Sequence, residues 1–217
     1  MTAALDDIAP EAIPQVHRIE STDIETAEPM VAEMLHSVYP HEQVYGEYCT
    51  LHGYVDCPPR QLYDYLAHIR SLEEWTYSLR GLTVTDTPGL WQGYDRLGAD
   101  TEVYARVEAN PDAMTVDYHC AWDQGAHLWM IYLMRVVDAQ AVLDRPGSVV
   151  LWTNCRHPFY DRNPFPAAAP AARDGWVGDY WDIFYPGHLL EMHNLKAIAE
   201  YRHSHGLPVT PEWVRGA

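Results

Sequence analysis

The chain has 217 residues, a formal net charge of −17 and a single lysine, Lys196. This length suits one domain with its own core. Such an acidic balance argues against a nucleic-acid binder, which needs a clustered basic face, and no apolar run approaches the roughly 20 residues of a membrane span. We therefore expect a protein that binds neither nucleic acid nor a membrane.

The N-terminal sequence and the cysteines both favour a cytoplasmic protein. The opening stretch MTAALDDIAPEAIPQ has no basic region and no apolar stretch, so it does not read as a secretory signal. The four cysteines contain no C-x-x-C pair, and we expect them to be reduced rather than joined in disulfides; they are Cys49, Cys57, Cys120 and Cys155.

The chain divides by composition into three parts. Residues 1–46 are acidic and punctuated by proline, which predicts a loosely held arm with one helix over Glu25–Val38. Residues 47–207 carry the domain, and residues 208–217 read as a tail.

The front of the domain predicts one strand and two short helices. Tyr48–Asp56 alternates as a strand, and the two prolines that follow end it. Arg60–Ile69 has apolar residues at helical spacing. Ser71 then provides a capping residue for a second short helix that ends at Trp75.

Six further strands follow, separated by turn sequences rather than by helices. A series of this kind predicts an antiparallel meander and not a parallel sheet, so the fold class is α+β with about seven strands. The predicted strands are Gly81–Asp86, Leu90–Arg96, Thr101–Ala109, Met114–Trp122, His127–Val137 and Ser148–His157.

The last element is a long amphipathic helix over Gly178–His205. Its apolar stripe consists of Leu189, Met192, Leu195, Ile198 and Ala199, with Glu191 turned away from it. The helix needs a partner, and a curved sheet wrapped around it would leave a cavity between the two. The long proline-rich loop before the helix should cross one end of that cavity.

The stretch VDCPPRQLYDYLAHIRSLEEWTYSLRGLTV resembles the START-like helix-grip superfamily, which includes polyketide cyclase and dehydratase-like proteins. The positions that carry the resemblance are Val55, Cys57, Pro58, Leu62, Leu66 and Trp75. The resemblance covers Tyr48 to His205. It implies a helix-grip fold with a deep, mainly apolar cavity, in a family whose members bind, carry, cyclise or dehydrate different compounds.

The hairpin around Asn-Pro-Asp sets which side chains face the cavity. A tight turn there places Val103, Ala105 and Val107 on the same face as Val116, Tyr118, Cys120 and Trp122, with Arg106 and Asp117 paired on the outer face. The strand that follows is apolar on both faces, which indicates a covered outer face or a homodimer interface.

Three residues are candidates for acid–base chemistry at the cavity: His157, Tyr118 and His188. A histidine titrates near neutrality, and a phenol can donate to a carbonyl oxygen. The structural alternative to a catalytic role for His157 is a hydrogen bond to the loop that follows it. Candidates for substrate contact are Trp75, Trp122, Arg135, Thr153, Cys155 and Met192.

These features favour a cofactor-independent aromatase/cyclase or dehydratase-like enzyme that acts on a carbonyl-bearing aromatic or polyketide-like molecule. One alternative is a non-catalytic carrier of an apolar small molecule. A second is a metal-dependent enzyme, for which the candidate ligands are His52, His119, His157 and His188. The sequence has no dinucleotide, Walker or serine-hydrolase motif.

Overall fold

A computed structural model of the chain describes residues 26, 29, 47–96, 101–169 and 175–215. The chain divides into two compact units, Met1–Val44 and Tyr45–Ala217. The predicted arm over 1–46, including its helix at Glu25–Val38, falls almost wholly outside the described residues. The following description concerns the second unit.

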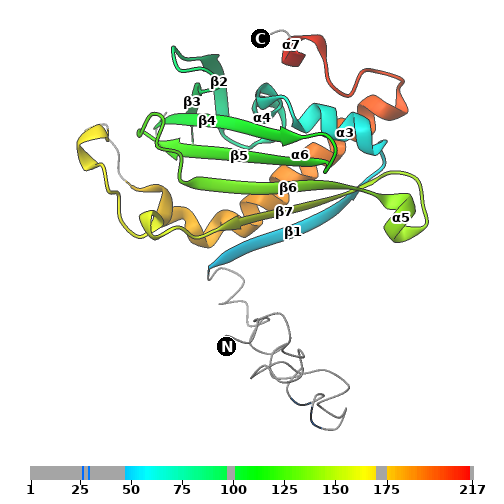
Figure 1. The fold of residues 1–217 in the computed structure, drawn as a ribbon, viewed down its shortest axis with the longest axis horizontal. Coiled ribbons are helices and arrows are strands. Elements are labelled where there is room, and N and C mark those ends of the chain that lie inside the picture. The colour runs from blue at the N-terminus through cyan, green and yellow to red at the C-terminus, as the bar shows by residue number, and fades with distance from the viewer. Residues whose placement is uncertain (1–25, 27–28, 30–46, 97–100, 170–174, 216–217) are drawn as a thin grey trace, which may run out of the picture. The chain divides into compact units, whose positions relative to one another are not determined.

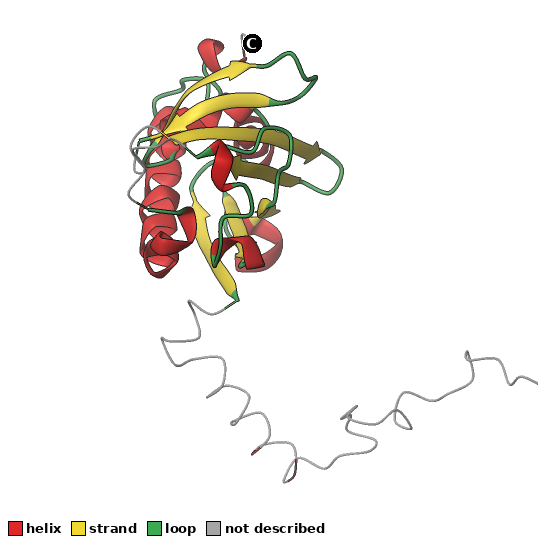
Figure 2. Cartoon of the chain, turned by 90° about the vertical axis from the view of Figure 1, so that its left-hand side faces the viewer, coloured by secondary structure: helices red, strands yellow, loops and turns green. Residues whose placement is uncertain are grey.

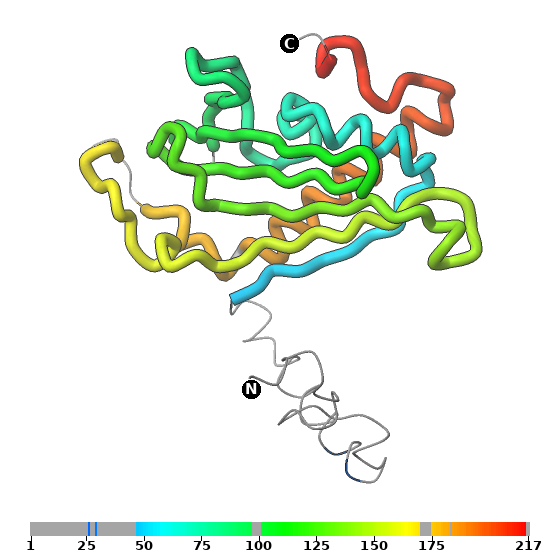
Figure 3. Tube along the Cα trace, in the orientation of Figure 1, coloured from blue at the N-terminus to red at the C-terminus, as the bar shows by residue number. Residues whose placement is uncertain are grey.

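Seven antiparallel strands form one sheet in the order β1-β7-β6-β5-β4-β3-β2. Consecutive strands from β2 to β7 are neighbours, and β1 lies beside β7 at the edge although the two are far apart in sequence (Figures 1 and 3). The predicted antiparallel meander is confirmed. The strands are β1 Tyr48–Val55, β2 Leu79–Val84, β3 Trp91–Asp95, β4 Thr101–Asn110, β5 Thr115–Trp122, β6 Met130–Asp138 and β7 Ser148–Cys155.

Short helices follow β1, as predicted, because Pro58 and Pro59 end the strand and Pro59 occupies the first turn of α3. Ser71 does not cap the second helix; its hydroxyl instead accepts a hydrogen bond from the Trp75 indole at 3.3 Å. The sequence did not predict the short helix between β6 and β7. The elements are α3 Pro59–Leu66, η3 Ile69–Ser71, α4 Leu72–Trp75 and α5 Ala139–Leu143.

The last helix occupies one face of the sheet, as Figure 2 shows, and the described parts of the proline-rich stretch precede it in the chain. The stretch contains the 3₁₀ turns η4 Pro158–Tyr160 and η5 Pro166–Ala168. The residues predicted to begin the helix form a third, η6 Val177–Ile183, and the α-helix α6 spans Phe184–Ser204. The helix-grip architecture is thus confirmed, and with it the resemblance at the level of the fold.

The buried stripe of α6 differs from the prediction at two positions, because His188 is buried in place of Leu189 and Ile198 is only partly buried. His188, Met192, Leu195 and Ala199 are buried, whereas Leu189 is 42 % exposed. Successive residues of a helix are turned by about 100°, so burial of His188 carries Leu189 out of the interface. Met192 packs against β1 at Gly53, where an added Cβ would lie 3.2 Å from the Met192 Cγ.

Hydrogen bonds from residues on one flank of α6 fix the helix to α4 and to the segment after it. Asn194 donates to the backbone carbonyl of Trp75 at 3.2 Å. Arg202 makes two 2.7 Å hydrogen bonds to the Glu74 carboxylate, which also accepts from the Tyr65 hydroxyl at 2.5 Å. Bidentate pairs of this kind fix orientation as well as distance.

The other flank is tied to the end of β1. Lys196 donates to the Tyr54 carbonyl at 3.1 Å and forms an ion pair with Glu200. Glu200 in turn accepts from the Asp56 backbone amide at 2.7 Å. The chain after α6 continues to α7 Glu212–Arg215, so the predicted tail includes a short helix that contacts η3.

The predicted inner face of β4 and β5 is confirmed, because Val103, Ala105 and Tyr118 are buried. The predicted pairing of Arg106 with Asp117 is wrong by two residues: the register places His119 opposite Arg106. The loop is longer than the tight turn assumed, which shifts the pairing while keeping the faces. On β6, Leu133 is 44 % exposed, and a homodimer interface there stays a prediction.

Among the helices in the described part of the chain, none is long and apolar enough to cross a membrane.

We expect Glu74→Gln to lower the free energy of unfolding by about 2–3 kcal/mol at pH 7, because Arg202 would keep a largely buried charge without its partner. Burial alone would raise the pKa of Glu74, but hydrogen bonds from Arg202 and Tyr65 outweigh it and lower the pKa. The carboxylate therefore stabilises the fold above pH 4.5, and the stabilisation is lost as the pH falls through the lowered pKa. Urea unfolding at pH 7 and pH 3 measures both effects.

The control is Asp64→Asn, which removes the Arg60–Asp64 ion pair between side chains that are 63 % and 48 % exposed. Exposed pairs contribute little, so a loss below about 0.5 kcal/mol is expected. Equal losses in the two variants would show that the Glu74–Arg202 pair does not hold α6 in place.

Candidate functional site

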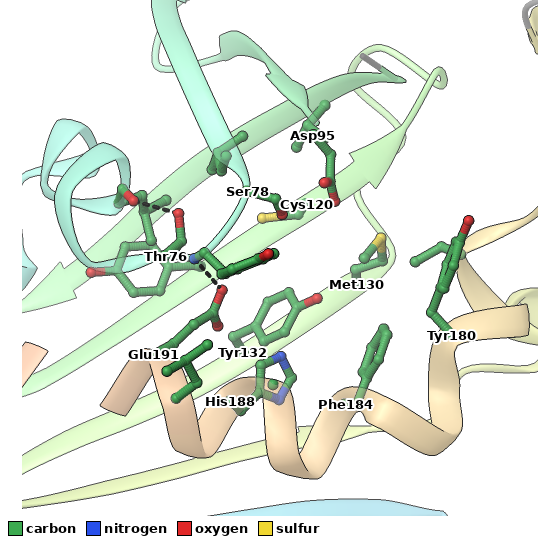
Figure 4. A pocket seen from close by; sticks show the side chains of 18 of the residues that line it. Thr76, Ser78, Asp95, Cys120, Met130, Tyr132, Tyr180, Phe184, His188 and Glu191 are labelled. Carbon is green, nitrogen blue, oxygen red and sulfur yellow. Dashed lines mark hydrogen bonds between the residues drawn. The ribbon is translucent and has the colours of Figure 1, made fainter. Parts of the chain in front are cut away.

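A cavity of about 470 Å³ lies between the first two turns of α6 and the inner face of the sheet (Figure 4). This volume falls in the range of small-molecule sites. The 3₁₀ turn η6 lines the cavity with Val177 and Tyr180, whereas none of the described residues of the proline-rich loop 158–176 does, so the crossing of one end of the cavity by that loop stays a prediction. The other lining residues include Leu72, Thr76, Leu79, Val103, Cys120, Met130, Phe184, Pro186 and Leu190.

Three tryptophans form flat apolar walls. Trp75 and Trp122, both predicted, line the cavity together with Trp152. The Trp75 and Trp152 rings meet edge to face with centroids 5.7 Å apart. Because the Trp75 indole N–H is already bonded to Ser71, this ring offers a ligand only an apolar surface.

Glu191 projects from α6 into this apolar cavity, although the sequence pattern turned it away (Figure 4). One carboxylate oxygen, Oε1, accepts a hydrogen bond from the Tyr77 backbone amide at 2.9 Å. Burial raises the pKa of Glu191 from 4.5 to about 7; the Tyr77 amide opposes this shift and the charge of Asp95 adds to it. Near neutral pH this carboxyl group can both give and take a proton.

His188 lies one turn before Glu191 and is buried among aromatic rings. Its ring centroid is 4.6 Å from that of Trp152 and 5.7 Å from that of Tyr132. Burial lowers the pKa of His188 to about 4, so the imidazole is neutral at pH 7. The Cys49 thiol lies 3.6 Å from Nδ1, and burial raises the thiol pKa to about 12, so the thiol stays protonated and can donate to this nitrogen.

Two tyrosines of the inner face differ in where their hydroxyls are directed. Tyr118 lines the cavity with its ring, but its hydroxyl donates to the Leu66 carbonyl at 2.5 Å and is not turned to a ligand. Tyr132, on β6, projects its hydroxyl into the cavity (Figure 4). Burial raises the pKa of Tyr132 well above 10, so the hydroxyl remains a hydrogen-bond donor.

His157 does not line the cavity. It is the residue before η4, where its Nδ1 accepts from the Phe159 backbone amide at 3.1 Å, and its ring packs on Trp129 at 5.6 Å. The prediction of a catalytic His157 is contradicted by this placement, and the hydrogen bond to the following loop is the role observed. A histidine at the end of a strand satisfies the next turn more easily than it reaches across the cavity.

Four predicted contact residues also lie elsewhere. On β7 the alternating buried residues include Trp152 and Asn154, so Thr153 and Cys155 point outward. The Thr153 hydroxyl is hydrogen-bonded to the Thr50 hydroxyl at 3.0 Å. Arg135 is exposed on the outer face of β6. Successive side chains of a strand point to opposite faces of the sheet, and each of these three residues is next to an inward-facing residue, so its own side chain points outward. Met192 is buried against Gly53, outside the cavity lining.

The four histidines considered as metal ligands do not converge. His52 is exposed on β1, His119 faces Glu108 at 3.9 Å on the outer face, and His157 and His188 have the separate surroundings given above. Among the residues that the structure describes, no group of three or more His, Cys, Asp or Glu side chains could hold a metal ion.

The sequence did not single out Glu191 or Tyr132. A weak signal existed for each. Glu191 follows His188 by three residues, which places the two on the same side of the helix, and Tyr132 alternates with Met130 and Met134, which places the three on the same face of the strand. Neither signal distinguishes a cavity residue from an ordinary one without knowledge of the helix position.

No family model matches the chain, and no curated protein matches it in sequence. Among solved structures, the ZhuI aromatase/cyclase from Streptomyces sp. R1128 has a TM-score of 0.49 at 12 % identity, over 72 % of this chain and 94 % of that chain. XoxI from Bacillus cereus has a TM-score of 0.47 at 12 % identity, over 70 % and 95 %. Protein CV1439 from Chromobacterium violaceum has a TM-score of 0.46 at 15 % identity, over 71 % and 98 %.

We expect Glu191→Gln to stabilise the protein more at pH 8 than at pH 5. The raised pKa means that the folded protein keeps a proton that the unfolded chain releases between pH 4.5 and 7. Ionised Glu191 therefore costs stability as the pH rises, by about 1–3 kcal/mol above pH 7. Glutamine keeps the Oε1 acceptor for Tyr77 and removes the charge.

Urea unfolding at the two pH values measures this difference, with Glu108→Gln as the control because its side chain is 62 % exposed on the outer face. A stability difference between Glu191→Gln and the unmodified protein that is the same at pH 5 and pH 8 would contradict the raised pKa.

Proposed function

We propose that this protein is a cofactor-independent cyclase or dehydratase-like enzyme that removes a proton from the carbon beside a carbonyl group of an aromatic or polyketide-like molecule. The observation that carries the proposal is the Glu191 carboxyl group, set in an apolar cavity with a pKa of about 7. A general base works best when its pKa lies near the working pH.

Glu191 has one oxygen free for chemistry. The Tyr77 amide holds Oε1, which fixes the carboxylate and leaves Oε2 for proton transfer. The substrate C–H bond breaks, its proton passes to Oε2, and the electron pair moves into an enolate. The enolate either attacks a second carbonyl carbon and closes a ring, with the new alkoxide taking the proton from Glu191, or expels a β-hydroxyl group that takes the proton from Glu191 and leaves as water.

The enolate oxygen needs a hydrogen-bond donor, and Tyr132 supplies one in this proposal. Its pKa, raised by burial, keeps the hydroxyl protonated while a negative charge develops opposite it. If Cys49 donates to Nδ1 of neutral His188, the other ring nitrogen, Nε2, carries the hydrogen and forms a second donor. Both donors act in a cavity whose apolar walls strengthen them.

The tryptophan walls favour a flat, conjugated substrate over an aliphatic one, because Trp75, Trp122 and Trp152 present ring faces and edges. A carrier with the same walls would bind such a molecule and leave it unchanged. The sequence resemblance is compatible with both roles, so the decisive test is whether a bound ketone loses a proton.

We expect the protein to accelerate the exchange of deuterium into the C2 position of 1-tetralone in D₂O, measured by proton NMR. Exchange requires ionised Glu191, so its rate should rise with pH through about 7. Glu191→Gln should lower the rate by about 10²–10⁴-fold, the usual contribution of a general base. Tyr132→Phe should lower it by about 10²-fold.

Binding of 1-tetralone is followed separately through the fluorescence of the cavity tryptophans and should persist in Glu191→Gln. Glu108→Gln, an acidic side chain on the outer face, is the matched control and should exchange at the unmodified rate. Binding without any accelerated exchange would overturn the proposal and leave the carrier as the function.

A further inference from the structure

The charged groups that line the cavity are all acidic. Among the described residues of the lining, Asp95 and Glu191 carry carboxyl groups, and none is an arginine or a lysine. His188 adds no positive charge at pH 7, because burial lowers its pKa to about 4. The field inside such a cavity attracts a cation and repels an anion.

The positive charge of Arg80 acts on the cavity from outside. It lowers the pKa of Glu191, but Arg80 is not a lining residue. Its guanidinium group donates hydrogen bonds to the backbone carbonyls of Thr76, Tyr77 and Leu79, at 3.0, 3.2 and 2.6 Å. These contacts hold the guanidinium group against the backbone, so a cation inside the cavity has to come from the ligand.

Aromatic rings form much of the remaining lining. Three tryptophans, four tyrosines and one phenylalanine contribute to it. The face of an aromatic ring is electronegative and attracts a cation that lies within about 6 Å of the ring centroid, most strongly where water is excluded. Rings combined with carboxyl groups are the surroundings that favour an ammonium group, whereas an apolar ligand needs only the rings.

One corner of the cavity brings rings and a carboxyl group together. Asp95 is the last residue of β3 and Trp122 the last residue of β5; they are paired with Thr101 and Val103 at the start of β4, which lies between the two strands. The Tyr180 ring, from η6, is 6.2 Å from the Trp122 ring and inclined to it by 58°. Figure 4 shows Asp95 and Tyr180 towards the same end of the cavity.

We propose that the substrate carries a cationic amino group, protonated or quaternary, and that Asp95, Trp122 and Tyr180 bind this group. The inference names a substrate class for the proposed function, and it rests on that function for the carbonyl end of the molecule, beside Tyr132 and Glu191. Both ends lie in one cavity of about 470 Å³, so a single small molecule can reach them.

Two effects compensate the cation for the water that it loses on entering. The negative charge of Asp95 acts at short range in an environment of low dielectric constant, whatever hydrogen bonds its oxygens accept within the protein. The inclined rings of Trp122 and Tyr180 add cation–π attraction. A quaternary ammonium group has no N–H to donate, so it is bound through these two effects alone and is the sharpest probe of the corner.

The test compares phenyltrimethylammonium with tert-butylbenzene, which has the same shape and no charge. Binding of each compound to the full chain is followed through the fluorescence of the cavity tryptophans at constant ionic strength and pH 8. We expect the ammonium ion to bind at least about tenfold more tightly, because only the ion gains from the carboxyl groups and the ring faces. Equal or weaker binding of the ion would overturn the inference.

Two variants locate the binding of the charge. Asp95→Asn should weaken binding of the ammonium ion by about tenfold, and Tyr180→Leu by about fivefold. Both should change the affinity for tert-butylbenzene by less than about twofold, since the corner stays apolar. The control is Glu108→Gln, which removes one negative charge from the outer face and should change neither affinity. It accounts for the attraction of any cation to a chain of net charge −17.

The outcomes separate this inference from the proposed function. If Asp95→Asn weakens binding no more than Glu108→Gln does, and Tyr180→Leu has no effect, the corner does not bind the cation and the inference is overturned, even if 1-tetralone still exchanges. A preference for the ion that both variants reduce supports the inference. In that case, the absence of exchange would overturn the proposed function alone. Thermal unfolding checks each variant, and either of the two suffices if the other does not fold.

Discussion

The position of α6 is set by polar contacts on both of its flanks, and the cavity follows from that position. Asn194 and Arg202 fix the helix to α4, while Lys196 and Glu200 fix it to the end of β1. Between them, Met192 and the residues after it fill the interface with the sheet. The first two turns of α6 lie beyond this packed region, and there the space between helix and sheet forms the cavity.

Glu191 belongs to the same system of contacts and to the site at once. Its hydrogen bond from the Tyr77 amide helps to hold α6 against the segment after α4, and burial of the carboxyl group in the cavity raises its pKa in spite of that hydrogen bond. Stability and acid–base chemistry are therefore opposed at this residue above neutral pH. A group that costs stability when ionised, inside an apolar cavity, is typical of functional sites.

The aromatic surroundings determine the protonation states on which the proposed chemistry depends. The rings around His188 exclude water, which keeps the imidazole neutral, and the same exclusion keeps the Tyr132 and Tyr160 hydroxyls protonated. The site then contains one group that changes charge near pH 7, Glu191, and several that act as neutral donors. This division of roles suits proton removal followed by stabilisation of an oxyanion.

The sequence determined the order of elements, the antiparallel sheet and the inner face of β4 and β5, because proline stops, turns and alternation are local properties of the chain. It also identified Trp75, Trp122 and His188 as cavity residues. Only the tertiary structure showed that Glu191, and not His157, lines the cavity. Glu191 lies at the margin of the apolar stripe of α6, and whether it faces the cavity depends on how contacts with α4 and β1 rotate the helix. His157 follows the end of β7, and its direction depends on which residues of that strand face inward. Long-range contacts decide both, so the local sequence does not.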